Sequence, residues 1–247
     1  MRGDEPSSAS SRPARTPVRC TSLAPPQPTT RPFVMLFSST PTTPGLLVTV
    51  DGPNGAGKST LVSALACELG PRLPVYATRQ PSPTPLGAMI RSSEQSFHGR
   101  ALACLVAADR HHQVESELLP QLREGRIVIC DRYVESSLVL QALDGVPLED
   151  IIAINRGVLR PDVRFRLKVP AAALQARLGE RERTGRERFE LAPDAAEREL
   201  VMYARADDLL AESGALSIVL DTGVAGPSEI AVQMAEAVRA RFSERSA

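Results

Sequence analysis

The chain has 247 residues, a length sufficient for one sizeable α/β domain with a hydrophobic core. Basic and acidic side chains are equal in number, 29 of each, so no global charge indicates nucleic acid or an acidic surface as a partner. Aromatic residues are few and tryptophan is absent, which argues against an aromatic platform for single-stranded nucleic acid.

The N-terminal segment differs in composition from the rest of the chain. It is rich in Ser, Thr, Pro and Arg, and its only acidic residues are Asp4 and Glu5. Such a segment buries too little apolar surface to fold, so we expect a disordered extension over residues 1–44 and a domain over residues 45–247. Two alternatives stay open: an organellar transit peptide, and a translation start at Met35 that makes the preceding residues an artefact.

A glycine-rich loop separates the first predicted strand from the first predicted helix. Residues 46–50 form a short, partly β-branched apolar run, as in a buried parallel strand, and residues 58–69 carry leucines at helical spacing. Between them, residues 52–59 have the sequence Gly-Pro-Asn-Gly-Ala-Gly-Lys-Ser, which fits the phosphate-binding P-loop pattern. Strand, loop and helix in this order distinguish a P-loop from a chance match.

The residue types of this loop suit a nucleoside triphosphate. Glycines let the backbone turn tightly and bring its N–H groups against phosphate oxygens, and the new helix adds its positive N-terminal end. We expect Lys58 to contact the β- and γ-phosphates of ATP and the Ser59 hydroxyl to bind Mg²⁺. The expected ATP-binding residues are Gly52, Asn54, Gly55, Ala56, Gly57, Lys58, Ser59 and Thr60. The alternative is a glycine turn that binds no ligand.

The rest of the chain alternates between strand and helix patterns. Further strands are expected at residues 75–78, 127–130, 163–169 and 216–220, and helices at residues 100–122 with a break near Pro120, 136–143, 148–159, 171–181, 195–213 and 227–242. Prolines predict a loop at residues 79–87, followed by a short helix. Charges alternate at Arg164, Arg166 and Lys168, which predicts a strand face that is partly exposed or covered by side-chain stems. The order predicts an α/β fold with a doubly wound, five-stranded parallel sheet flanked by helices.

Asp131 follows the apolar run 127–130 directly. In an open parallel sheet, ligands lie beyond the carboxyl ends of the strands, so we expect Asp131 beside the P-loop, where it would hold Mg²⁺ together with Ser59. The alternative is an aspartate that only caps the next helix. The chain lacks an Asn-Lys-x-Asp motif, which disfavours a GTPase switch.

With these motifs placed, the chain from Leu46 onward resembles the thymidylate kinase family, which has the P-loop NTPase fold. The matching blocks are the P-loop at residues 51–60, residues 78–87, Ala108-Asp109-Arg110, residues 131–141, Arg160-Pro161-Asp162 and Arg188-Phe189-Glu190. The resemblance implies an Mg²⁺-dependent transfer of the γ-phosphoryl group of ATP to the 5′-phosphate of a deoxynucleoside monophosphate. It also implies a nucleotide-biosynthesis enzyme that acts as a homodimer, without nucleic acid or membrane.

The resemblance further implies roles for individual residues. The expected catalytic residues are Lys58, Asp131, Arg132 and Arg188, and the expected acceptor-binding residues are Arg79, Arg91, Val106, Arg110, Arg132, Ser137, Leu140 and Gln141. A mobile lid is expected to carry Arg181, Arg183, Arg186 and Arg188. Because the P-loop has Asn54-Gly55 and no arginine, the lid should supply the transition-state arginine, as in the bacterial type. The alternative is a solvated charged loop held by local Glu–Arg pairs.

Four positions depart from the family pattern. Asn54 replaces a carboxylate that engages the sugar 3′-hydroxyl, Gln80 replaces a glutamate, Val106 replaces the phenylalanine that stacks on thymine, and Leu140 replaces a tyrosine that senses the 2′-position. These changes predict that thymidine monophosphate is a poor or non-preferred acceptor. The alternatives are therefore a kinase for a modified or other pyrimidine nucleotide, a nucleoside kinase, or a non-catalytic nucleotide-binding relative.

The expected location is the cytoplasm. No apolar run is long enough to span a membrane. None of the four cysteines forms a C-x-x-C pair, and three lie in apolar runs, so we expect buried free thiols in a reducing compartment.

Overall fold

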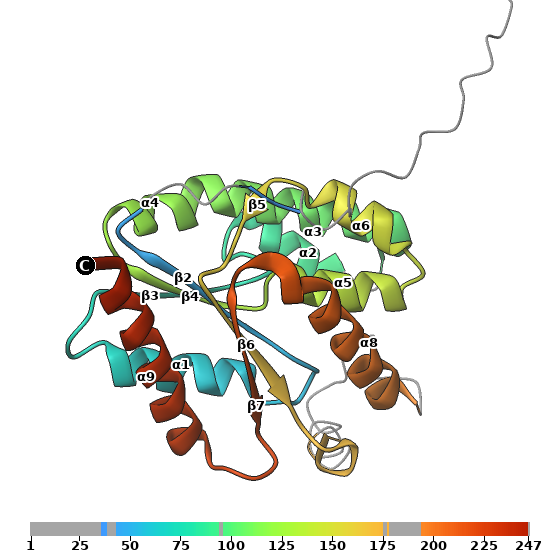
Figure 1. The fold of residues 1–247 in the computed structure, drawn as a ribbon. Coiled ribbons are helices and arrows are strands. Elements are labelled where there is room, and N and C mark those ends of the chain that lie inside the picture. Colours follow the sequence, from blue (N-terminus) through green and yellow to red (C-terminus); the bar gives the residue numbers. More distant parts are fainter. Residues whose placement is uncertain (1–35, 39–42, 94–95, 175–176, 178–193, 247) are drawn as a thin grey trace, which may run out of the picture. The chain divides into compact units, whose positions relative to one another are not determined.

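The computed structural model describes residues 36–38, 43–93, 96–174, 177 and 194–246. A five-stranded parallel sheet, with strand order β3-β4-β2-β6-β7, runs through the domain (Figure 1). The strands are β2 (Leu46–Asp51), β3 (Val75–Arg79), β4 (Ile127–Asp131), β6 (Val163–Lys168) and β7 (Leu216–Asp221). The first of these strands in the chain, β2, lies at the centre, with later strands on both sides. This topology confirms the predicted doubly wound sheet.

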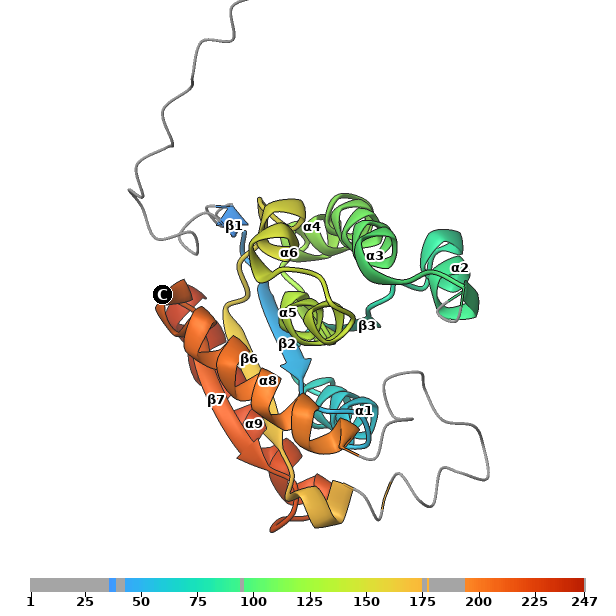
Figure 2. The same cartoon turned by 90° about the vertical axis from the view of Figure 1, so that its right-hand side faces the viewer.

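Helices cover both faces of the sheet, as Figures 1 and 2 show. They are α1 (Lys58–Leu69), α2 (Pro85–Ser93), α3 (Gly99–Gln113), α4 (Leu119–Arg123), α5 (Val134–Leu143), α6 (Leu148–Ile154), α8 (Ala195–Leu210) and α9 (Pro227–Ser246). A π-helix, Val114–Leu118, joins α3 to α4. Helices α1 and α9 pack on one face, and α3 to α6 with α8 pack on the other. Since β2 and β4 are covered on both faces, every residue of these two strands is buried.

Several predicted element boundaries differ from the structure, and three of these differences have a clear cause or consequence. Helix α2 begins at Pro85, inside the predicted loop, because proline lacks only an N–H that the first helical turn does not use. The predicted kink near Pro120 begins earlier, as the π-helix that ends at Leu118. Helix α6 ends at Ile154, and the end of the predicted helix forms a short strand, β5 (Val158–Leu159).

A second, two-stranded sheet draws part of the N-terminal segment into the domain. Strand β1 (Phe37–Ser38) pairs in parallel with β5, and the side chain of Leu36 is completely buried in the core around α5 and α6. The domain thus includes Leu36 to Ser38, which lie before the boundary expected at residue 45.

Removing residues 1–33 should leave the thermal midpoint unchanged, because their composition provides too little apolar surface for a core. Removing residues 1–38 should lower the free energy of unfolding by about 2 kcal/mol, the value of fully burying one leucine side chain. Thermal unfolding of the two truncated proteins checks both expectations. Destabilisation by the shorter deletion would show that residues before Leu36 pack against the domain.

The charged face of β6, predicted to be partly exposed or covered by side-chain stems, becomes more exposed along the strand. Arg164 is buried and forms an ion pair of 2.6 Å with the buried Glu135 of α5. Arg166 is partly buried and pairs with Asp207 of α8 at 3.1 Å. Only Lys168 is exposed. A buried arginine is stable here because a carboxylate on the covering helix neutralises it.

The expectation of buried thiols holds for Cys130, but Cys67 and Cys104 are exposed. Both lie on the solvent side of their helices, a feature that an apolar local sequence does not reveal. Over the described residues, the structure has no helix with the length and apolar character that crossing a bilayer requires.

Candidate active site

The P-loop joins the carboxyl end of β2 to the start of α1. Gly52, Gly55 and Gly57 have φ angles of 150°, 81° and 92°, a region that side chains disfavour. A Cβ atom at Gly52 would also lie 2.8 Å from the carbonyl oxygen of Leu167. The loop therefore needs glycine for its turn and for its close approach to β6, and the strand–loop–helix arrangement is as predicted.

Lys58 is buried against the carbonyl groups of the loop. Its ammonium group donates to the carbonyl oxygens of Gly52 at 2.8 Å and Pro53 at 2.7 Å. Burial, with a smaller effect from nearby Arg132, lowers the pKa of Lys58 to about 7. A phosphate anion beside this nitrogen would raise the pKa of Lys58 again, because it favours the charged form. The loop is therefore suited to bind a polyphosphate through a charged Lys58.

Ser59 and Asp131 meet at the carboxyl ends of β2 and β4, as predicted. The Ser59 hydroxyl donates to Oδ2 of Asp131 at 2.5 Å. Oδ1 of Asp131 is buried and has no hydrogen-bond partner. A hydroxyl beside an unsatisfied carboxylate oxygen fits Mg²⁺, which binds through one or two protein oxygens and completes its shell with phosphate and water. The described residues contain no group of three or more His, Cys, Asp or Glu side chains that could hold a metal ion.

Arg132 has an unusual backbone conformation. Its φ angle of 67° lies in the left-handed region, and among the described residues it is the only non-glycine residue with a positive φ. Its guanidinium donates to the side-chain oxygen of Asn54 in the P-loop and, at 3.4 Å, to the hydroxyl of Ser136 in α5. A residue in this conformation persists only where its surroundings hold it, and such residues gather at functional sites.

This conformation leads to a stability prediction. Arg132→Gly should unfold with a free energy roughly 1 kcal/mol higher than Arg132→Ala, because glycine adopts a positive φ without the steric cost of a Cβ atom. Both variants lose the same guanidinium contacts, so their difference reports the backbone alone. Urea unfolding of the pair provides the measurement, and equal midpoints would contradict the left-handed assignment.

Two adjoining cavities lie beside the P-loop. The first is lined by Asn54, Gly55, Gly57, Lys58, Ser59, Thr60, Arg79, Arg91 and Asp131, and the second by Val106, Arg110, Ser137 and Gln141 together with apolar residues. Four residues, Gln80, Pro81, Arg132 and Leu140, line both cavities. All the predicted acceptor residues thus surround a space that continues into the phosphate-binding loop.

A third cavity lies on the other side of the P-loop. Ala56 lines it with Gly55, Gly57 and Thr60, opposite Arg177, Thr222, Ala225 and Pro227. Arg177 donates to the carbonyl oxygen of Thr222 at 2.9 Å. We did not predict Arg177 or Thr222 as site residues. The sequence could have indicated Thr222, because it directly follows a strand, β7, and so lies at the same edge of the sheet as Asp131.

Arg110 is almost completely buried and is held by the protein itself. Its Nε donates to the side-chain oxygen of Gln80 at 2.8 Å, Nη1 donates to Asn155, and Nη2 donates to the Ser137 hydroxyl at 2.7 Å. Its guanidinium also lies 5.7 Å from the centre of the Tyr133 ring. The predicted base-binding arginine is therefore fixed in one orientation in the wall of the second cavity.

A chain of hydrogen-bonded side-chain amides explains why position 80, one of the four departures, has glutamine in place of glutamate. Gln113 donates through Nε2 to Thr78 and to Glu117, so its oxygen faces Gln80. Gln80 in turn donates to that oxygen at 3.1 Å and presents its own oxygen to Arg110. A glutamate at position 80 would place a carboxylate against the Gln113 oxygen, so the neutral amide suits this environment.

Glu199 of α8 contacts the P-loop, a contact that the sequence did not predict. Both of its carboxylate oxygens accept from the backbone N–H of Asn54, at 3.1 and 3.2 Å. The side chain is buried, and no local motif connects it to a loop 145 residues away. The predicted lid residues Arg181, Arg183, Arg186 and Arg188 lie outside the described residues.

A glycine loop with a buried lysine, an adjacent Ser–Asp pair and a second, arginine-lined cavity define a P-loop enzyme that brings a nucleoside triphosphate to a second ligand. The class is that of the nucleoside monophosphate kinases. Comparisons with known proteins identify the family within this class.

The family model for thymidylate kinase matches residues 50–216. The chain is 38% identical over 197 residues to a probable thymidylate kinase of Pyrobaculum aerophilum, covering 78% of this chain and 95% of that relative. It is 34% identical over 140 residues to a thymidylate kinase of Xylella fastidiosa, covering 56% of this chain and 64% of that relative. A solved thymidylate kinase structure from Candida albicans has a TM-score of 0.66 at 20% identity, covering 80% and 93% of the two chains, which supports the fold. The chain belongs to the thymidylate kinase family.

Proposed function

We propose that this chain transfers the γ-phosphoryl group of ATP to the 5′-phosphate of thymidine monophosphate. The observation that carries the proposal is the pair of adjoining cavities that share Arg132, because phosphoryl transfer between two nucleotides needs both to meet at one cationic wall. The relatives are named as thymidylate kinases, and nothing in the comparisons favours a different acceptor or a non-catalytic role.

On the donor side, the backbone N–H groups of the P-loop and the ammonium of Lys58 would bind the phosphates of ATP. Ser59 and Asp131 would hold Mg²⁺, which neutralises phosphate charge when bound. The third cavity, between Ala56 and Arg177, extends from the same loop and is the place we propose for the adenosine part. Each group acts by position and charge, since this reaction requires little covalent chemistry from the protein.

On the acceptor side, Arg79, Arg91 and Arg132 line the cavity beside the P-loop and would neutralise the acceptor phosphate. Arg110 and Ser137 would contact the base edge deeper in the second cavity. The side-chain oxygen of Gln141 is buried there without a hydrogen-bond partner, so it suits an N–H donor of the base.

The lid, the assembly and the location complete the proposal. We propose that the segment with Arg181, Arg183, Arg186 and Arg188 acts as a lid and that Arg188 contacts the transferring phosphoryl group. By family resemblance, the enzyme works as a homodimer in the cytoplasm.

A coupled assay for ADP release tests the function. The purified chain, ATP and Mg²⁺ are combined with thymidine, deoxyuridine, uridine and deoxycytidine monophosphates and with thymidine. Turnover of thymidine monophosphate supports the proposal. ADP release with thymidine alone would identify a nucleoside kinase, and ATP binding without turnover of any acceptor would identify a non-catalytic relative.

The pocket departures remain relevant to selectivity, although the comparisons give no support to thymidine monophosphate as a poor acceptor. Val106 and Leu140 both line the cavities described above. Base–aromatic stacking is worth ~1–3 kcal/mol, and Val106 cannot stack as an aromatic ring does. We therefore expect this chain to prefer thymidine monophosphate over uridine monophosphate by less than about 100-fold, a margin of 2.7 kcal/mol.

Introducing the two aromatic rings of the family pattern by mutation measures their effect on acceptor preference. The variant with Val106→Phe and Leu140→Tyr should raise the preference for thymidine monophosphate over uridine monophosphate, measured as a ratio of kcat/KM, by about 10-fold, equivalent to 1.4 kcal/mol. Ile90→Val, in the same cavity but on α2, a different helix from Val106 and Leu140, provides the control. A native preference above 100-fold would mean that other residues have rebuilt the pocket.

A further inference from the structure

We propose that Asp51 is a positioning residue that fixes Arg132, and through it the acceptor phosphate, in the reaction proposed above. The part of the inference that concerns the acceptor rests on that proposed function. Asp51 is the last residue of β2, is 1% exposed and lines none of the three cavities, so we place its carboxylate out of contact with either nucleotide. It lies outside the predicted site residues, and its importance becomes apparent only from its contacts.

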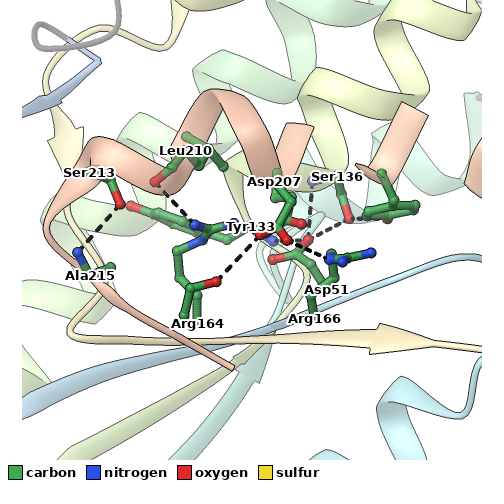
Figure 3. A network of polar contacts seen from close by, with 12 residues as sticks. Asp51, Tyr133, Ser136, Arg164, Arg166, Asp207, Leu210, Ser213 and Ala215 are labelled. Atoms are coloured by element: carbon green, nitrogen blue, oxygen red, sulfur yellow. Dashed lines mark hydrogen bonds and ion pairs between the residues drawn. The ribbon is translucent and has the colours of Figure 1, made fainter. Parts of the chain in front are cut away.

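One carboxylate oxygen of Asp51 accepts three hydrogen bonds from the segment that follows Arg132. The donors are the backbone N–H groups of Tyr133 and Ser136, both at 3.1 Å, and the Ser136 hydroxyl at 2.7 Å. Figure 3 shows Asp51, Tyr133 and Ser136 within this network. The two backbone donors lie at the N-terminal end of α5, where N–H groups have no partner inside the helix. Asp51 therefore anchors the start of α5 to the end of β2.

This anchor adjoins the strained residue. The N–H of Arg132 donates to the carbonyl oxygen of Val50 at 3.0 Å, and the next N–H, that of Tyr133, donates to Asp51. Two consecutive residues of β2 thus hold the peptide groups before and after the Arg132 α-carbon. A positive φ persists only where surrounding contacts impose it, and these two contacts flank the rotated bonds.

The backbone conformation determines where the guanidinium lies. With φ at 67°, the side chain of Arg132 reaches Asn54 in the P-loop and lines both cavities. Relaxation to a right-handed or extended conformation would move the Cβ atom and direct the guanidinium away from this wall. Misplacement of a substrate-holding group by about 1 Å can cost ~10²-fold in rate, so the buried carboxylate matters to turnover without contacting substrate.

The first test is kinetic. Asp51→Ala should lower kcat/KM for the acceptor nucleotide on the order of 10²-fold, while the dissociation constant for ATP changes less than about threefold. Asp51→Asn should be intermediate, about 10-fold below the native chain, because an amide oxygen accepts more weakly than a carboxylate. Glu135 is a buried carboxylate on α5 that pairs with Arg164 and not with the segment after Arg132. Glu135→Gln should therefore leave kcat/KM for the acceptor within about threefold of the native value. Native-like acceptor use by either Asp51 variant would overturn the proposal, as would an equal loss with Glu135→Gln.

The second test does not depend on turnover. In the native background, Arg132→Gly should have a higher urea midpoint than Arg132→Ala, because of the positive φ. With Asp51→Ala added, that difference should narrow sharply, since residue 132 then keeps only its contact with the Val50 carbonyl and can leave the left-handed region. If Asp51→Ala does not fold, the Asp51→Asn background replaces it, and the difference should narrow. An undiminished difference would overturn the proposal. A chain that shows this coupling but phosphorylates no acceptor would instead contradict the proposed function.

Discussion

Replacing Lys58 by alanine is expected to lower kcat by at least ~10²-fold, the cost of losing one preorganised charge at the transferring group. The ammonium lies within the P-loop, held by the carbonyl oxygens of Gly52 and Pro53, where it would contact the phosphates of ATP. The fold should remain intact, because burial disfavours the charged form of this ammonium and alanine removes that cost. The measurement is the coupled ADP-release rate beside a thermal unfolding curve.

The chain offers a matched control for this variant. Only two lysines occur in it, Lys58 and Lys168, while all its other basic side chains are arginines. Lys168 is exposed at the end of β6 and lines none of the three cavities. Lys168→Ala should therefore retain native turnover. Near-native turnover of Lys58→Ala would exclude the proposed role of the P-loop in catalysis.

The parts of the site that the sequence predicted share a local cause. Glycines, lysine and serine at residues 52–59 fit one motif, and the position of Asp131 follows from its place directly after an apolar strand. The sheet was predictable for the same reason, since the runs at residues 46–50 and 127–130 are apolar except for Thr49 and need covering on both faces. In each case, the local sequence determines the secondary-structure element and the edge of the sheet at which the residue lies.

The parts that were missed depend on pairs far apart in sequence. Arg164 belongs to a face predicted to be partly exposed or covered by side-chain stems, but the sequence did not indicate that Glu135 pairs with it from α5. Glu199 contacts the P-loop across 145 residues, and Leu36 is buried under elements that follow residue 130. The local sequence shows whether such a residue is charged or apolar, but it does not show which distant residue will pair with it or cover it. The conformation of Arg132 was missed for the same reason, as Val50 and Asp51 impose it from another strand.

Arg188→Ala is expected to lower kcat by on the order of 10³-fold, the lower end of the effect of a transition-state arginine. The P-loop supplies Lys58 but has Gly55 where an arginine could otherwise reach the phosphates. The cations that line the first cavity beside Lys58 are Arg79, Arg91 and Arg132, which we assign to the acceptor. An additional cation is then needed for charge that develops on transfer. Arg188 precedes Phe189-Glu190 in the block that resembles the end of the family lid.

The lid arginines provide their own controls. Alanine substitutions at Arg181, Arg183, Arg186 and Arg188, made one at a time, separate a catalytic arginine from solvated charges. The dissociation constant for ATP should change little in Arg188→Ala, because a contact made only in the transition state affects kcat and leaves ground-state binding alone. An equal loss of ATP affinity and turnover would indicate uniform binding instead. A large loss of kcat at one of the other three positions would assign the catalytic role to that arginine.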